Sequence, residues 1–130
     1  MKLNLGCHLS VSGGYTKMGK DALMVGANTF QFFTRNPRGG SVKLPSKEDI
    51  LGLVKIMEEN SFAPIIAHAP YTFNPCALDE GIRDYTKRTM AEDMKLLDSI
   101  PGALYNFHPG SHVQQGAEIG IAKTADTLNS

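Results

Sequence analysis

Four short apolar runs alternate with four segments of helical character along this chain, and the alternation limits the folds open to it. The apolar runs span residues 3–9, 29–33, 63–67 and 103–107. Strands that alternate with helices pair in parallel, through right-handed crossovers. We therefore predict an α/β fold of four consecutive βα units, forming a single domain over residues 1–130.

The segments between the runs carry apolar residues at helical spacing. The clearest stripe runs from Ile50 to Met57 at i, i+3, i+4 and i+7, and Ser46 with Asp49 forms a capping-box pattern ahead of it. Helices are predicted over residues 15–25, 46–60 and 78–99, with a last helix ending near Asn129. Outside residues 46–60, these side chains are expected to face inward: Met18, Ala22, Val25, Ile82, Met90, Met94, Leu97, Ile121, Ala125 and Leu128.

Composition narrows the function classes. The 13 basic and 13 acidic residues balance, which argues against a dedicated basic nucleic-acid-binding module but not against an enzyme that contacts phosphates locally. No apolar run approaches the roughly 20 residues of a membrane span, and residues 1–6 lack a signal-peptide pattern. We therefore expect a cytoplasmic protein without a membrane partner. Cys7 and Cys76 are too few for a disulfide framework and are expected to be buried, reduced thiols.

Histidines stand at or near the ends of three predicted strands. His8 lies in the C-terminal half of the first strand, while His68 and His108 directly follow the third and fourth. The C-terminal ends of parallel strands share one rim, and neutral imidazole is a common metal ligand. The pattern therefore favours a metal site, most strongly for His68 and His108. The alternative is a set of histidines held by hydrogen bonds in a polar barrel mouth.

Carboxylates are missing from these strand ends. A divalent metal that activates water usually needs acidic ligands as well. Five acidic residues belong to the long helix, where we expect them to form a solvated face: Asp79, Glu80, Asp84, Glu92 and Asp93.

Four motifs, in order along the chain, resemble the endonuclease IV family of apurinic/apyrimidinic endonucleases. Residues 6–14 (GCHLSVSGG) are similar to the opening Gly-x-His-x-Ser-x-x-Gly-Gly motif, and residues 32–38 (FFTRNPR) to Phe-Thr-Lys-Asn-x-Arg. Residues 68–71 (HAPY) are similar to His-x-x-Tyr. Residues 106–112 (NFHPGSH) match the Asn-Phe-His-Pro-Gly-Ser-His motif throughout.

This resemblance implies a TIM barrel with a trinuclear zinc site that cleaves the backbone of double-stranded DNA 5′ to an abasic residue. By position, His68 and His108 would be ligands of the same zinc ion. Arg38 and Tyr71 would enter the DNA at the lesion, with Asn36 on the same DNA-binding loop as Arg38. These side chains suit such roles, because arginine binds phosphate and tyrosine stacks on bases.

Two further histidines belong near the implied site without being first-choice ligands. His8 is expected to lie close to it as a supporting residue. His112 is expected to order its loop or to contact phosphate.

The implied barrel would be only half present. A TIM barrel has eight βα units and about 250 residues, whereas four units are predicted here, corresponding to the N-terminal half. The family's remaining zinc ligands have no counterpart in the chain, and the outer strands would be open edges. We expect a truncated chain, two copies that complete a barrel, or a partner chain that supplies the rest. The isolated chain is accordingly expected to lack nuclease activity.

Two other functions stay open at this point. One is a sugar isomerase or epimerase on a related barrel with a divalent metal. The other is a non-catalytic βα module that only assembles or binds, for which the missing carboxylates are the main argument.

Overall fold

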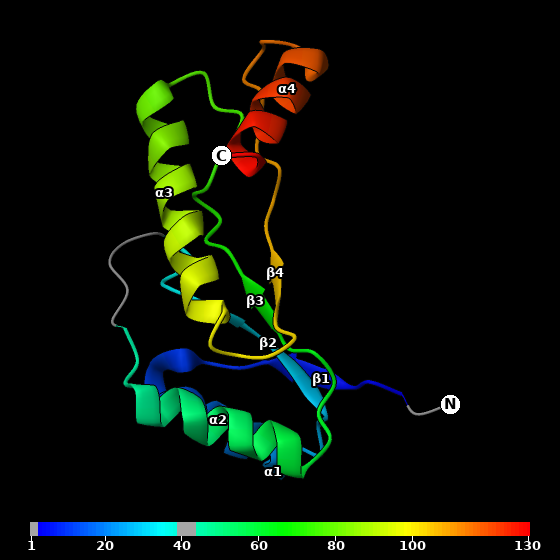
Figure 1. The fold of residues 1–130 in the computed structure, drawn as a ribbon. Helices are drawn as coiled ribbons and strands as arrows, with labels where there is room; N and C mark the ends of the chain where they lie inside the picture. The colour runs from blue at the N-terminus through cyan, green and yellow to red at the C-terminus, as the bar shows by residue number, and fades with distance from the viewer. Residues whose placement is uncertain (1–2, 39–43) are drawn as a thin grey trace.

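A computed structural model describes residues 3–38 and 44–130, and in them the predicted alternation of strands and helices is confirmed (Figure 1). The strands are β1 (Gly6–His8), β2 (Thr29–Phe33), β3 (Ile66–His68) and β4 (Leu104–Asn106). They form one parallel sheet in the order β1-β2-β3-β4. Only β2 has the predicted length, while the other three are shorter than the apolar runs that contain them.

The helices follow the predicted positions closely. After the short 3₁₀ helix η1 (Val11–Gly13), they are α1 (Tyr15–Met24), α2 (Lys47–Glu59), α3 (Glu80–Leu97) and α4 (Ala117–Leu128). Gly26 follows α1 with a φ of 72°, the left-handed conformation that ends a helix at low cost in glycine. None of the helices in the described ranges is long and apolar enough to cross a membrane.

One face of the sheet carries the hydrophobic core. Phe30, Phe32 and Ala67 point to this face and are almost fully buried. They pack in one cluster with Met18 of α1 and Leu53 of α2, two helices that lie side by side (Figure 1). The inward stripe predicted for residues 50–57 is therefore confirmed, with Val54 half-buried.

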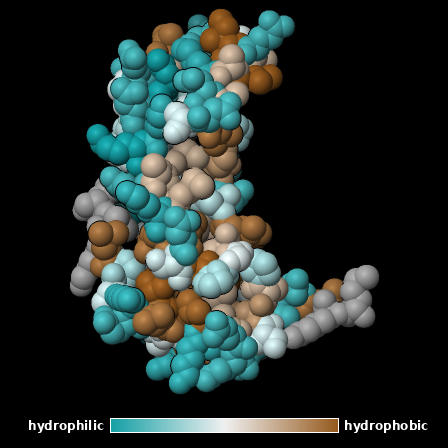
Figure 2. Space-filling model, in the orientation of Figure 1, coloured by the Kyte–Doolittle hydropathy of each residue, from teal (hydrophilic) through white to brown (hydrophobic). Residues whose placement is uncertain are grey.

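The outer strands and helices expose apolar groups that the sequence pattern predicted to be inside. Val25 after α1 is 65% exposed, and Ile121 and Leu128 of α4 are 70% and 54% exposed. Figure 2 shows apolar side chains at the surface where α4 lies, at the end of the molecule opposite α1 and α2. The predicted helical spacing of these side chains was right, but no part of the described chain covers them.

Three further burial predictions fail. Ile82 and Met94 of α3 are 46% and 54% exposed, because the buried side of α3 is set by Thr86, Met90 and Leu97 instead. Cys7 is exposed, because β1 is an outer strand with a neighbour only on its β2 side. Cys76 is buried as predicted.

Asp49 joins the first two helices. Ser46 accepts a hydrogen bond from Asp49 N, which confirms it as the N-cap of α2. The Asp49 carboxylate turns away from its own helix, however, and accepts hydrogen bonds from Tyr15 N and Thr16 N, both at 2.8 Å. Asp49 therefore caps α1, where Gly14 offers no side chain. Burial works against the carboxylate charge, but these backbone N–H groups outweigh it and lower the pKa of Asp49.

We predict that Asp49→Ala lowers the free energy of unfolding by about 1–2 kcal/mol at pH 7, the usual cost of losing a cap. Because the folded-state pKa of Asp49 lies below the unfolded value of about 3.9, this contribution is complete above that pH and is lost as the pH falls through the folded-state pKa. Urea unfolding between pH 2.5 and 7 would measure it. Glu48→Ala, on an exposed residue of the same turn, is the control, and an Asp49→Ala deficit that does not change with pH would contradict the cap.

Candidate functional site

The strand register places residues near the predicted site side by side on neighbouring strands. Phe33 pairs with His68, and His68 pairs with Asn106, so their side chains leave the sheet on the same face, opposite the core. His68 is the last residue of β3, and His108 follows the end of β4 by two residues. The strand ends thus place both histidines on one rim.

Four aromatic rings form a cluster at this rim. The ring centroids of His68 and His108 are 5.2 Å apart, and those of Phe33 and Tyr71 are also 5.2 Å apart. His68 contacts Phe33 and Tyr71 at 5.1 and 5.6 Å, and Tyr71 contacts His108 at 5.8 Å. His68 is only 7% exposed, whereas Tyr71 is 64% exposed. The cluster is buried at His68 and open to solvent at Tyr71.

One nitrogen of His68 is available as a ligand. Its Nδ1 lies 2.6 Å from Ala69 O. A carbonyl oxygen can only accept, so Nδ1 carries the hydrogen and Nε2 keeps a free lone pair. A hydrogen bond from one ring nitrogen to a backbone carbonyl is the usual way in which a metal-binding histidine is oriented.

The two histidines fit a shared metal ion. Imidazole nitrogens bound at about 2.0–2.1 Å to one tetrahedral zinc ion place the ring centroids about 5 Å apart, which agrees with the 5.2 Å between His68 and His108. Across residues 3–38 and 44–130, no further His, Cys, Asp or Glu joins the pair in a group that could hold a metal. The described residues therefore bring together two candidate ligands, fewer than the three or four that a zinc ion usually takes from the protein.

His8 lies one strand further from the pair. Its ring contacts Phe33 of the neighbouring strand, with centroids 4.8 Å apart, and Phe33 in turn contacts His68. Its Nδ1 lies 3.2 Å from Gln31 Nε2. Within the structure, His8 is thus separated from the histidine pair by the Phe33 ring.

The loops that carry Arg38 and Tyr71 are joined directly. Tyr71 N donates a hydrogen bond of 2.9 Å to Pro37 O. Arg38 N donates one of 2.9 Å to Asn36 Oδ1, and both Asn36 and Arg38 are exposed. The three residues predicted to contact DNA therefore lie on adjoining loops beside the histidine pair. Residues 39–41, which follow Arg38 in the sequence, lie outside the described residues.

His112 lies on the segment before α4. Its Nδ1 accepts a hydrogen bond of 3.3 Å from Gly116 N, and its backbone O accepts one of 3.0 Å from Gln115 N. His112 therefore supports the turn that leads into α4.

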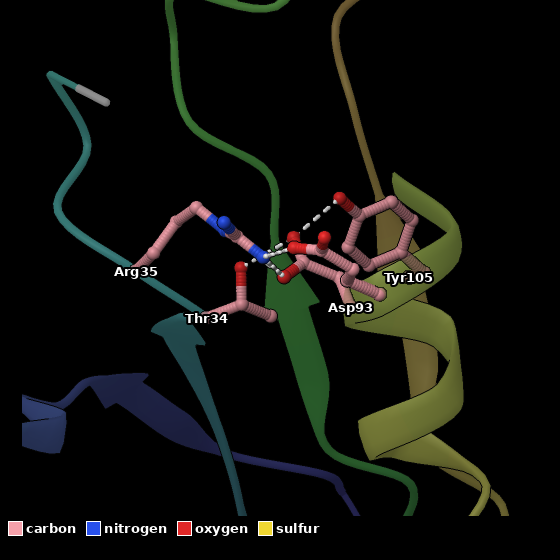
Figure 3. A network of polar contacts seen from close by, with 5 residues as sticks. Thr34, Arg35, Asp93 and Tyr105 are labelled. Carbon is pink, nitrogen blue, oxygen red and sulfur yellow. Dashed lines mark hydrogen bonds and ion pairs between the residues drawn. The ribbon is translucent and has the colours of Figure 1, made fainter. Parts of the chain in front are cut away.

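Asp93 is buried, which corrects the prediction that it belongs to a solvated face of α3. Its side chain is 1% exposed and forms an ion pair with Arg35, whose side chain is 4% exposed. Figure 3 shows the carboxylate facing Thr34 and Arg35 from one side and Tyr105 of β4 from the other. Arg35 donates to Oδ1 through Nε and Nη2 at 3.1 and 2.6 Å. Thr34 and Tyr105 donate to Oδ2 at 2.7 and 2.8 Å.

The pKa values of Arg35 and Tyr105 are both shifted in the direction that keeps these groups protonated. Burial disfavours the charge on Arg35, but its hydrogen bonds to Asp93 outweigh this effect and raise the pKa of the guanidinium. Burial, followed by the charge of Asp93, raises the pKa of Tyr105, so the phenol stays protonated and donates. Arg35 is therefore an anchor of its loop and not a free loop charge.

The sequence contains a signal for Asp93 that the prediction of a solvated face overlooked. Asp93 falls three residues after Met90 and four before Leu97, so it lies on the buried stripe of α3. A carboxylate at such a position requires a buried partner, and Arg35 is the charged residue directly after β2.

Comparisons with known proteins agree with this arrangement. The family model described as xylose isomerase-like TIM barrel matches residues 20–130. A probable endonuclease 4 of Alkaliphilus oremlandii is 53% identical over 127 residues, which are 98% of this chain and 45% of that protein. A probable endonuclease 4 of Clostridium botulinum is also 53% identical, over 98% of this chain and 46% of that protein. The chain thus spans about half the length of the curated relatives it matches.

Two solved structures also match nearly all of this chain over about half of their own length. Endonuclease IV from Thermus thermophilus superposes with a TM-score of 0.81 at 23% identity, over 95% of this chain and 45% of that one. D-psicose 3-epimerase from Clostridium cellulolyticum superposes with a TM-score of 0.67 at 12% identity, over 97% of this chain and 46% of the other. At these identities, both likenesses concern the fold alone.

We predict that Asp93→Asn lowers the free energy of unfolding by about 3 kcal/mol, because the buried Arg35 charge then keeps only the exposed Glu92 carboxylate, 3.4 Å away, as its ionic partner. The double variant Arg35→Met/Asp93→Asn should be less destabilised than the sum of the two single variants. Chemical denaturation measures all of these values. Asp84→Asn, on an exposed carboxylate of the same helix, should change stability by less than about 0.5 kcal/mol. Equal, small effects at positions 84 and 93 would show that the ion pair does not stabilise the fold.

Proposed function

The chain belongs to the xylose isomerase-like TIM-barrel family, in which it corresponds to the N-terminal half of endonuclease IV proteins, and on that premise we propose that it forms part of a zinc-dependent DNA-repair endonuclease. The substrate is double-stranded DNA with an abasic site, whose backbone is hydrolysed 5′ to the lesion. One observation carries this proposal. The histidine pair, with the geometry of two ligands of one metal ion, lies beside an exposed tyrosine and a loop that presents Asn36 and Arg38.

His68 and His108 hold the zinc ion in this proposal. When bound, the metal supplies Lewis-acid stabilisation of the phosphate and lowers the pKa of its water. The Ala69 carbonyl orients His68 so that Nε2 points away from the backbone contact. His8 and His112 support the site without binding the metal, His8 through Phe33 and His112 through the turn before α4.

Tyr71, Asn36 and Arg38 contact the DNA in this proposal. A base gap exposes the faces of neighbouring bases, and an exposed tyrosine ring can stack on such a face. The Arg38 guanidinium can bind phosphate or fill the gap. Because Tyr71 N is bonded to Pro37 O, the two loops present their groups as one surface.

The described residues supply only part of the metal site, so we propose that the chain alone does not complete the reaction. A second copy, or the missing half of the barrel, would supply the remaining ligands. The outer strands β1 and β4 offer the edges where such a half would pair.

We predict that the chain binds a duplex with a tetrahydrofuran abasic analogue more tightly than the intact duplex. Tyr71→Ala should reduce this preference about tenfold, since stacking on one base contributes about 1–3 kcal/mol. Arg38→Ala should weaken binding to both duplexes and lower the salt dependence by about one phosphate contact. Fluorescence anisotropy at several salt concentrations would measure both effects.

The matched control for the lost charge is Lys55→Ala, because Lys55 is exposed on α2 and pairs with Glu59. It should leave the preference for the abasic duplex unchanged. If Tyr71→Ala and Arg38→Ala bind both duplexes as the parent chain does, the DNA-contacting role is wrong.

We also predict that the chain binds zinc at the histidine pair without nicking the abasic duplex. Isothermal titration should show binding that His68→Ala and His108→Ala each weaken at least tenfold, because each variant removes one of two ligands. Glu59→Ala, at an exposed carboxylate of α2, is the control and should retain the affinity. Robust zinc-dependent nicking by the chain alone would contradict the incomplete site, and equal zinc affinity in His68→Ala would contradict the metal role.

A further inference from the structure

The side chain of Asn74 holds Ser111, in the segment that follows His108, through two hydrogen bonds. Ser111 N donates to Asn74 Oδ1 at 3.1 Å, and Asn74 Nδ2 donates to Ser111 O at 3.0 Å. The amide therefore satisfies the donor and the acceptor of the same residue. Only a carboxamide offers an acceptor and a donor side by side in this way. Aspartate would lack the donor, and serine would be too short to span both.

The two residues before Ser111 fit against the same loop. Gly110 has a φ of 86°, and a Cβ there would overlap the side-chain oxygen of Asn74. The Cys76 Sγ lies 3.3 Å from Pro109 O and also 3.3 Å from Asn74 Oδ1. Three successive residues after His108 thus contact the loop that follows His68.

Asn74 is itself fixed to α3. Its backbone N donates to Thr86 Oγ1 at 3.2 Å, and Thr86, which is fully buried, donates to Ile82 O at 2.8 Å. We call the hydrogen bonds of Asn74 with Thr86 and Ser111 the clamp. The clamp connects α3, the loop after β3 and the segment after β4.

His108 needs such a clamp more than His68 does. His68 is the last residue of β3, and its pairing with Phe33 of β2 and Asn106 of β4 fixes its backbone. His108 is exposed and lies beyond the end of β4, so no strand pairing fixes its position. The residues that directly follow His108 are therefore the part of the chain that can restrain it, together with the His68 and Tyr71 rings that it contacts.

We propose that Asn74 is a positioning residue that sets the separation of the His68 and His108 rings and thereby the affinity of the metal site. This inference rests on the proposed zinc-binding role of the pair. It assigns to the Asn74 carboxamide a function in the site although Asn74 touches neither the metal nor the substrate.

The test compares Asn74→Ala, Asn74→Asp and Gly110→Ala with the parent chain. Gly110→Ala disturbs the clamp from the opposite side and leaves the carboxamide in place. Asn60→Ala is the matched control, because Asn60 forms one side-chain hydrogen bond at the end of α2, to Ile56 O. Zinc affinity should fall about 10- to 100-fold in Asn74→Ala and Gly110→Ala, the usual effect of losing a residue that orients a ligand. It should fall less in Asn74→Asp and stay unchanged in Asn60→Ala.

A second readout does not depend on zinc. The four histidines of the chain can be followed individually in long-range ¹H–¹⁵N NMR spectra. The parent chain should show a nuclear Overhauser contact between the His68 and His108 rings, and Asn74→Ala should lose it at an unchanged urea midpoint. Persistence of that contact in Asn74→Ala and Gly110→Ala would overturn the positioning role, whether or not zinc binds. Absence of zinc binding in the parent chain would instead overturn the metal role. If Asn74→Ala does not fold, Asn74→Asp and Gly110→Ala decide by the same criterion.

Discussion

The buried carboxylate of Asp93 is the interaction on which the order of the rim depends. It accepts four hydrogen bonds from Thr34, Arg35 and Tyr105. Thr34 and Arg35 directly follow β2, and Tyr105 belongs to β4. A buried charge is tolerated only when it is fully paired, so any displacement of these segments would carry a large energetic cost. The network lies on the core face of the sheet. It thereby fixes the start of the loop after β2 and of the segment after β4, both of which lead to the site on the opposite face.

The architecture followed from the sequence because it depends on short-range patterns. The alternation of apolar runs and helical stripes, and the cap at Ser46, are local signals that the structure confirms. The burial of a helix face could be predicted only where the element that covers this face belongs to the described residues. Val25, Ile121 and Leu128 have the right spacing but are exposed, because a helical period specifies a face and not what covers it. The burial of Asp93 was missed although its covering partner belongs to the described chain, because this partner, Arg35, is 58 residues away in the sequence.

The candidate site was predictable to the extent that strand ends determine it. The positions of His68 and His108 followed from parallel pairing and from the motif resemblance, and the rings do lie together. The roles of Asn36, Arg38 and Tyr71 remain predictions, although the structure joins their loops. The contacts of Asn74 with Ser111 could not be foreseen, because nothing local in the sequence indicates that a loop amide would bind a backbone segment 37 residues later.

The order of the sheet has a consequence for how this protein acquires its structure. Each strand pairs with the strand that follows it in the chain, and among the helices α1 contacts α2 and α3 contacts α4. Contacts between consecutive units carry a low entropic cost of loop closure. A nascent chain leaving the ribosome can therefore add each βα unit to a sheet that already exists, and His68 and His108 come together only when the fourth strand and the residues after it arrive.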